Sequence, residues 1–310
     1  MTAPTGNGTH MGFVGVTTGS SSIMKVFPKW AEVLGLPTHT LIGHDIELGA
    51  PQETYRDVVG SIKGTSDHWG ALVTSHKIAV FEAAHDLFDD LDELAQTFGE
   101  ISSIAKRGSH LTGSAKDPVT VRLALEEFLP AEHFSTTGAA ALILGSGGSG
   151  CALSHQLGAR TDRPSRVICT AQSNERLDHQ RQLHERAGID PTLMQYVKTT
   201  GPDDVDALLA ALPPSSLVVN ATGMGKDRPG SPLSDSGRFP EQGMVWEFNY
   251  RGSLEFLHQA RAQQTGRGLV IEDGWRYFIH GWTQVIADVF DIPMPHETVD
   301  ELAQVAAGVR

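Results

Sequence analysis

The segment Ala139–Gly150, with the sequence AAALILGSGGSG, constrains the fold of this 310-residue chain more than any other. Its apolar first half predicts a strand, and its glycines open a predicted helix. Gly145, Gly147 and Gly150 have the spacing G-x-G-x-x-G, which in a strand–helix setting is typical of loops that bind a dinucleotide pyrophosphate. The first glycine permits a tight turn, the second lets the phosphates approach the backbone, and the third lets helix and strand pack closely. N–H groups at the helix N-terminus would face the phosphates.

Short apolar runs alternate with amphipathic segments along most of the chain, which predicts an α/β fold with a mostly parallel sheet covered by helices on both faces. Near the N-terminus we expect strands at Phe13–Thr17, His39–Gly43 and Gly70–Thr74, and helices at Ile23–Leu34 and Lys77–Leu87.

The middle of the chain interrupts this alternation. A hairpin is expected within Gly99–Gly113, a helix at Pro118–Leu129 and a polar linker at Pro130–Gly138. A second alternating series then begins, whose strands are expected at Ala139–Leu144, Arg166–Thr170, Leu217–Asn220 and Met244–Phe248. The sequence therefore predicts two domains with a boundary near residue 130.

The residues after the second strand of the second series bear on the choice between NAD and NADP. An NAD site commonly has an acid there that binds the ribose hydroxyls. This chain has Gln172 and Ser173, and its first carboxylate is that of Glu175. We therefore expect a weak preference for NADP, with Ser173 and Arg176 available to a 2′-phosphate.

Composition excludes several function classes. The formal net charge is −13 and no run of basic residues occurs, which argues against nucleic acid or an anionic membrane surface as the partner. No apolar stretch is long enough for a membrane helix, and the first ten residues lack the blocks of a signal peptide. Two cysteines, Cys151 and Cys169, give no disulfide framework. The histidines show no metal-ligand spacing, and His179 and His184 fall on a predicted surface helix. We expect a cytoplasmic protein without a bound metal.

Six short blocks of the chain resemble the shikimate/quinate dehydrogenase family, and together they span nearly all of it. They are GVTTGSSS (Gly15–Ser22), GALVTSHK (Gly70–Lys77), GSAKD (Gly113–Asp117), GSGGSG (Gly145–Gly150), VVNATGMG (Val218–Gly225) and WEFNY (Trp246–Tyr250). The resemblance implies an N-terminal βα substrate domain (1–130), a Rossmann dinucleotide-binding domain (131–273) and C-terminal helices (274–310) that return to the substrate domain.

The resemblance also implies roles for single residues. Lys77 matches the family's catalytic lysine and Asp117 its carboxylate partner. Such a pair suits reversible alcohol oxidation, because a tuned lysine can accept the hydroxyl proton while a nicotinamide cofactor takes the hydride. The residues assigned to the substrate are Ser20, Ser21, Ser22, Thr74, Ser102, Tyr250, His280 and Gln284. The residues assigned to the cofactor are Gly145, Ser146, Gly147, Gly148, Ser149, Gly150, Ala171, Gln172, Ser173, Arg176, Asn220, Ala221, Thr222, Gly223, Met224, Phe248 and Gly274.

Several family positions differ in this chain. Leu72, Ser102 and Ala115 stand where the family has asparagines, and Gly281 stands where it has a glutamine. A site that binds hydroxyls through such groups does not keep its selectivity without them. We therefore expect a small hydroxylated, shikimate/quinate-like or cyclitol-like substrate. A true NADP-dependent shikimate 5-dehydrogenase and a non-catalytic ligand or dinucleotide sensor remain as alternatives. A homodimer is compatible with each of them.

Some of these residues also have plainer interpretations. Ser22 could simply cap the helix that follows it, and Cys151 could be a small packing residue. His76 and Lys116 are expected to be solvated.

Overall fold

The computed structural model describes residues 8–226 and 228–309, so part of the polar N-terminal segment lies outside it. The chain divides into two compact units, Met1–Lys116 with Ile279–Arg310, and Asp117–Phe278. The division falls before helix α5 (Asp117–Glu126), not after it as the sequence suggested. The reason is that α5 packs against α7 (Gly148–Ala159) of the second unit.

The sheet of the first unit has six strands in the order β2-β1-β3-β5-β6-β4. The strands are β1 (His10–Gly15), β2 (Leu41–Asp45), β3 (His68–Val73), β4 (Asp90–Leu91), β5 (Ser103–Arg107) and β6 (His110–Ser114). The predicted parallel pairing holds for β1 with β2 and β3. The strands β5 and β6 form the expected hairpin, and β5 joins β3 in antiparallel orientation, so the sheet is mixed.

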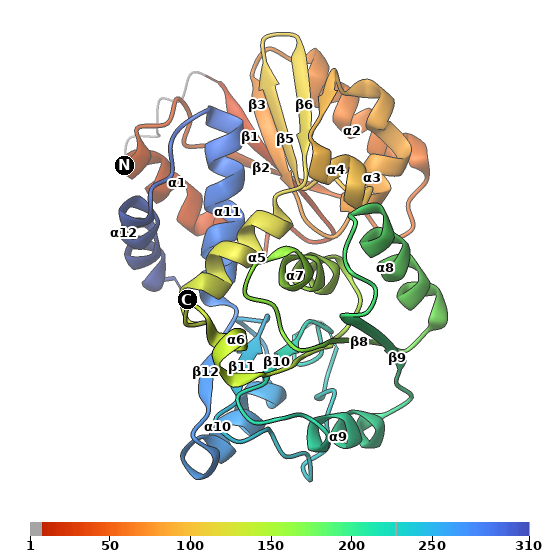
Figure 1. The fold of residues 1–310 in the computed structure, drawn as a ribbon. Helices are drawn as coiled ribbons and strands as arrows, with labels where there is room; N and C mark the ends of the chain where they lie inside the picture. The colour runs from red at the N-terminus through yellow and green to blue at the C-terminus, as the bar shows by residue number, and fades with distance from the viewer. Residues whose placement is uncertain (1–7, 227, 310) are drawn as a thin grey trace. The chain divides into compact units, whose positions relative to one another are not determined.

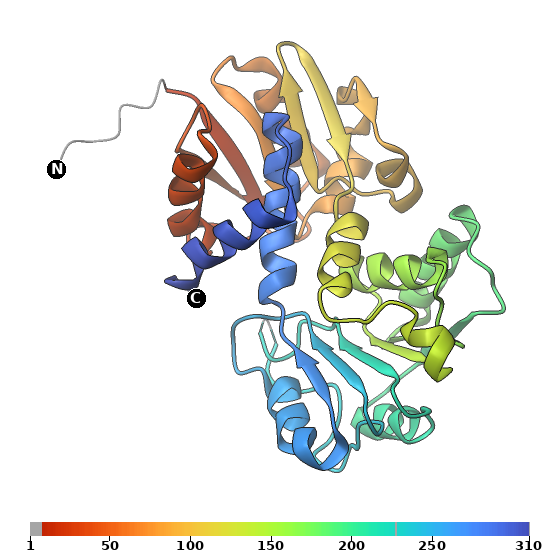
Figure 2. The same ribbon diagram turned by 60° about the vertical axis from the view of Figure 1, so that its left-hand side comes forward.

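Helices cover both faces of this sheet (Figure 1). They are α1 (Ile23–Leu34), α2 (Gln52–Gly64), α3 (Lys77–Ala84), η1 (His85–Leu87), α4 (Glu93–Phe98), the part of α11 (Trp275–Phe290) from Ile279 onward, and α12 (His296–Ala307). The bounds of α1 are those predicted from the sequence. The last helix, α12, lies beside α1 in both views (Figures 1 and 2), where Trp30 Nε1 donates to the carbonyl oxygen of Leu302 at 2.8 Å.

The second unit is a doubly wound parallel sheet in the order β12-β11-β10-β7-β8-β9. The strands are β7 (Ala141–Leu144), β8 (Val167–Ala171), β9 (Met194–Lys198), β10 (Leu217–Asn220), β11 (Met244–Glu247) and β12 (Val270–Glu272). Every pairing is parallel. This order is that of a Rossmann domain, in which the strand order reverses between the first and fourth strands, here β7 and β10. The structure therefore confirms the predicted fold class.

The helices of this unit lie in two layers (Figures 1 and 2). The helices α7 and α8 (Asn174–Arg186) cover one face of the sheet, and α9 (Pro202–Ala210) and α10 (Glu255–Arg267) cover the other. The linker expected at Pro130–Gly138 instead contains a short helix, α6 (His133–Thr137). The Asp162 carboxylate stabilises its first turn by accepting from the N–H groups of Phe134 and Ser135. None of the helices formed by the described residues is long and apolar enough to cross a membrane.

Candidate functional site

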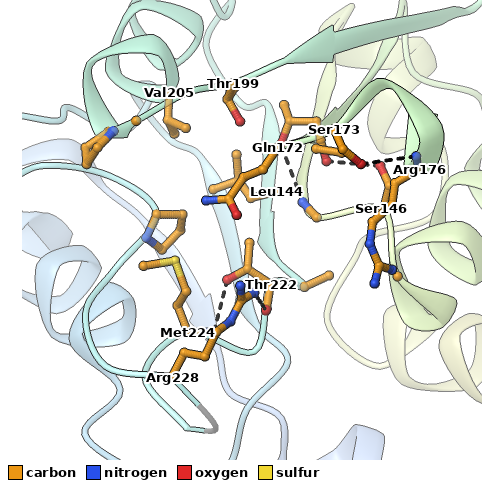
Figure 3. Close-up of a pocket in the computed structure, with 18 of the residues that line it drawn as sticks. Leu144, Ser146, Gln172, Ser173, Arg176, Thr199, Val205, Thr222, Met224 and Arg228 are labelled. Atoms are coloured by element: carbon orange, nitrogen blue, oxygen red, sulfur yellow. Dashed lines mark hydrogen bonds between the residues drawn. The ribbon is translucent and has the colours of Figure 1, made fainter. Parts of the chain in front are cut away.

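A cavity of about 500 Å³ opens at the carboxyl ends of the strands of the second unit (Figure 3). Its walls include the ends of β7, β8 and β10, so it lies where the strand order reverses. In open parallel sheets this is the position at which ligands bind. The residues that line it are Leu144, Gly145, Ser146, Gly147, Thr170, Ala171, Gln172, Ser173, Arg176, Thr199, Gly201, Pro202, Val205, Ala221, Thr222, Met224, Arg228, Ser231 and Pro232.

The glycine loop forms one wall of this cavity. Gly145 has a φ of +106°, and a Cβ atom added there would lie 2.7 Å from the Ala221 carbonyl oxygen. A Cβ on Gly150 would lie 2.1 Å from the carbonyl oxygen of Gly145, so helix and strand approach at that point. Gly147 is the N-cap of α7 and has no side chain with which to cap it. The first N–H groups of the helix are therefore not capped by the residue before it, as an anion-binding helix end requires.

The end of β8 and the start of α8 form the next wall. Ser173 is the N-cap of α8, where its Oγ accepts from the N–H of Arg176 at 3.4 Å. Arg176 projects from the first turn of α8, and Arg228 projects from the loop after β10 (Figure 3). None of the described residues that line the cavity is acidic, and two of them, Arg176 and Arg228, carry a guanidinium group. The cavity therefore suits an anionic ligand, and these residues fit a dinucleotide that carries an additional phosphate.

The segment after β10 has a fixed conformation. Asn220 Oδ1 accepts from the N–H and the Oγ1 of Thr222 at 3.1 and 2.6 Å, and Thr222 Oγ1 accepts from the N–H of Met224 at 3.1 Å. A terminal nitrogen of Arg228 donates to the Thr222 carbonyl oxygen at 2.7 Å. Because a guanidinium has five N–H groups, this bond orients Arg228 and still leaves donors for a ligand.

The buried carboxyl group of Glu247 also stabilises the segment after β10 through hydrogen bonds. Glu247 is fully buried, and its two oxygens accept from Asn220 Nδ2 at 2.7 Å and from the N–H and Nδ2 of Asn249 at 2.8 and 2.7 Å. Asn249 Nδ2 also donates to the Met224 carbonyl oxygen at 3.0 Å. Burial raises the pKa of Glu247 to about 7, although the hydrogen bonds from the two asparagines act in the opposite direction.

Ten of the residues assigned to the cofactor line this cavity: Gly145, Ser146, Gly147, Ala171, Gln172, Ser173, Arg176, Ala221, Thr222 and Met224. Gly148, Ser149 and Gly150 form the first turn of α7, while Asn220 is the last residue of β10 and Gly223 lies in the segment after it. Phe248 and Gly274 lie together elsewhere in the unit, because a Cβ on Gly274 would be 2.1 Å from the Phe248 carbonyl oxygen.

Nine of the described lining residues were not assigned to the cofactor from the sequence: Leu144, Thr170, Thr199, Gly201, Pro202, Val205, Arg228, Ser231 and Pro232. Thr199, Gly201 and Pro202 directly follow β9, so an explicit prediction of that strand would have placed them at the same sheet edge. Arg228 lies in a segment that contains no recognisable motif. Only the folded loop brings it to the cavity.

In the first unit, the predicted residues fall at the ends of strands and the starts of helices. Lys77 is the first residue of α3 and is half-buried, and Thr74 follows β3 directly. Ser20 is exposed, while Ser21 and Ser22 are half-buried before α1. Ser22 occupies the N-cap position, but its side chain makes no capping hydrogen bond because its backbone is already helical.

Ser102, His280 and Gln284 also belong to the first unit. Ser102 is buried, and its Oγ accepts from the N–H of Lys116 at 2.7 Å. His280 is buried and Gln284 is half-buried, and they lie one turn apart on α11.

The remaining two predicted residues belong to the second unit. Asp117 begins α5 and is buried. Tyr250 packs against the rings of Trp275 and Phe278 at centroid distances of 5.6 and 4.6 Å.

Three residues expected to be at the surface are more enclosed than predicted. His76 is buried, with its Nε2 2.8 Å from the Ile46 carbonyl oxygen. Lys116 forms an ion pair with Asp288 at 3.1 Å. His184 is buried on α8 between Ser154 and Tyr196. In each case a partner far away in sequence encloses the side chain. Cys151 is buried, as a packing residue would be.

Comparison with known proteins finds similarity to dehydrogenases. No protein-family model matches it. It is 30% identical over 185 residues to a shikimate dehydrogenase (NADP(+)) of Streptococcus gordonii, a match that covers 58% of this chain and 61% of that protein. It is 29% identical over 214 residues to the shikimate dehydrogenase (NADP(+)) of Symbiobacterium thermophilum, which covers 68% of each.

The fold is that of a solved structure of quinate dehydrogenase from Corynebacterium glutamicum in complex with NAD. The TM-score is 0.75 at 20% identity, and the match covers 97% of this chain and 99% of that one.

Proposed function

We propose that the chain is a divergent member of the shikimate/quinate dehydrogenase family and an NAD(P)-dependent oxidoreductase that interconverts an alcohol and a ketone on a small hydroxylated substrate. Its similarity to shikimate dehydrogenases in sequence and to a quinate dehydrogenase in fold supports this proposal. The observation that carries the proposal is the cavity at the reversal point of the parallel sheet, with an uncapped helix N-terminus and two guanidinium groups on its walls. This combination suits a dinucleotide pyrophosphate and an additional phosphate.

We infer that NADP is the preferred cofactor. Both curated relatives are named for NADP(+), whereas the quinate dehydrogenase structure contains NAD. The absence of an acid among the described lining residues, together with Arg176 and Arg228, favours the 2′-phosphate of NADP over the free hydroxyl of NAD.

Separate residues have separate roles in the proposed reaction. A bound nicotinamide cofactor supplies the hydride acceptor for alcohol oxidation. The proposal assigns to Lys77 Nζ the acceptance of the hydroxyl proton and to the Asp117 carboxylate the orientation of Lys77. Ser20, Ser21, Thr74 and Gln284 are proposed to bind the substrate's polar groups.

The substrate class follows from the differences at the positions that correspond to family ligands. Ser102 is engaged by backbone groups, and Leu72 and Ala115 have no hydrogen-bonding side chain. We therefore propose a shikimate/quinate-like or cyclitol-like substrate, with shikimate itself as one member of the panel to be tested.

The experiment follows nicotinamide absorbance at 340 nm with NAD and NADP against shikimate, quinate and cyclitols. Turnover with one of them should fall about 10²–10⁴-fold in Lys77→Ala, as for loss of a general base, while NADP binding persists. Lys25→Ala, an exposed lysine on α1, is the matched control and should retain full activity.

If the wild-type chain binds NADP but shows no turnover that is lost in Lys77→Ala, the enzymatic proposal is wrong. A dinucleotide sensor then replaces it. The cytoplasmic location, the absence of a nucleic-acid partner and the homodimer stay predictions, of which light scattering tests the last.

A further inference from the structure

A line of hydrogen bonds runs from the glycine loop into the interior of the second unit. Ser146 Oγ donates to Gln180 Oε1 at 2.6 Å, and Gln180 Nε2 donates to Ser154 Oγ at 2.8 Å. Ser154 Oγ lies 2.8 Å from His184 Nε2, and His184 Nδ1 lies 2.7 Å from the Tyr196 hydroxyl. We call these five residues the Ser146–Tyr196 network.

The network is buried over most of its length. Gln180 and Ser154 are 0% exposed, His184 is 2% exposed and Ser146 is 5% exposed. Burial lowers the pKa of His184 to about 4, so at neutral pH its ring offers one donor and one acceptor, as a position between two hydroxyl groups requires. Buried polar groups cost free energy unless their partners are in place, so these side chains favour one arrangement of their helices.

The network links two parts of the cavity wall that the sequence places far apart. Ser146 is the loop residue between Gly145 and Gly147. Its Oγ also lies 3.0 Å from the Thr170 carbonyl oxygen, and the 2.6 Å contact with Gln180 Oε1 is the shorter of the two that its single hydroxyl proton can serve. Gln180 lies on α8 one turn after Arg176, which faces the cavity. The bond between Ser146 and Gln180 therefore fixes the glycine loop relative to the first turn of α8.

We propose that Gln180 is a positioning residue for the cofactor, and this rests on the proposed function. Through Ser146 it sets the separation between the loop that binds the pyrophosphate and the helix end that binds the adenosine 2′-phosphate. NADP contacts both places at once, and its affinity depends on their being held at the matching distance. A smaller ligand that reaches only the N-terminus of α8 does not depend on the Ser146–Gln180 hydrogen bond.

The test measures binding of NADP and of adenosine 2′-monophosphate by calorimetry to the full-length protein. Gln180→Met and Ser146→Ala should each raise the Kd for NADP on the order of tenfold, as the loss of one well-placed buried hydrogen bond does. The double variant should bind NADP no more weakly than the single variant with the higher Kd, since both changes break the same Ser146–Gln180 hydrogen bond. The Kd for adenosine 2′-monophosphate should change less than about twofold in every variant, since this ligand needs no link between the two places.

Tyr196→Phe is the matched control, because it removes a hydrogen bond from the far end of the same network. It should leave the Kd for NADP unchanged. An equal loss of NADP affinity in Tyr196→Phe, or additive losses in the double variant, would show a general destabilisation and overturn the proposal.

The small change Ser146→Ala keeps the test decisive even where Gln180→Met does not fold. If the wild-type protein binds NADP and Ser146→Ala binds it equally well, the positioning role is wrong and the proposed function stands. If the wild-type protein binds neither NADP nor NAD, the proposed function itself is wrong.

Discussion

The three glycines of the G-x-G-x-x-G loop have different local requirements. Gly145 adopts a left-handed backbone conformation, and Gly150 has no room for a Cβ atom beside the Gly145 carbonyl. Gly147 has a φ of −83°, which any residue adopts, and a Cβ there would meet nothing within 4 Å. The first and third glycines are therefore required by the fold, whereas the second leaves space next to the cavity.

This difference predicts opposite effects of two alanine substitutions. Gly145→Ala combines a strained φ with a 2.7 Å approach to the Ala221 carbonyl oxygen, and should lower the free energy of unfolding by about 1–3 kcal/mol. Gly147→Ala should leave stability within about 0.5 kcal/mol but weaken NADP binding, because its methyl group takes space that the phosphates need. Urea unfolding and calorimetric titration measure the two effects. A stable Gly145→Ala variant would contradict the argument.

At the scale of elements, the segment after β10 is held by Glu247 through Asn220 and Asn249. Because the pKa of Glu247 is raised from 4.5 to about 7, the folded protein keeps a proton that the unfolded chain loses in this range. The contribution of Glu247 to stability is therefore fully present below about pH 4.5 and decreases as the pH rises toward 7.

Glu247→Gln tests this sign. The free energy of unfolding of the wild type should fall relative to that of Glu247→Gln between pH 4.5 and 7, by at most about 3 kcal/mol. Urea titrations at several pH values measure the difference. A wild-type curve parallel to that of the variant would mean that Glu247 ionises normally in the folded state.

Elements whose signals are local could be predicted from the sequence. The helix α1 has the predicted bounds, because it combines regular apolar spacing with the stop at Gly35, whose φ is +61°. The helix α6 was missed because Asp162, in a distant loop, stabilises its first turn. The antiparallel addition of β5 to β3 was missed because pairing partners are not encoded in the spacing of one segment.

At the scale of the whole molecule, the first unit is built from both ends of the chain. Leu302 on α12 is fully buried, and its carbonyl oxygen accepts from the Trp30 indole, 272 residues earlier. The C-terminal helices therefore complete the core that α1 begins.

Leu302→Ala should lower the free energy of unfolding by about 2–5 kcal/mol, because it leaves a cavity in a buried contact. Gln304→Ala, at an exposed position on the same helix, should change it by less than about 0.5 kcal/mol. Denaturant unfolding followed by circular dichroism compares the two variants. Equal stability of both would mean that α12 does not belong to the cooperative core.

The sequence by itself determined the alternation of strands and helices, the dinucleotide loop and most of the residues around it. These features are local, because a strand end, a glycine turn and a helix start lie within about a dozen residues. Only the tertiary structure brought Arg228 to the cavity, buried His76 and His184, and joined Ser146 to Gln180. Burial and long-range hydrogen bonds depend on how separate elements pack, and residue spacing within one segment does not specify that packing.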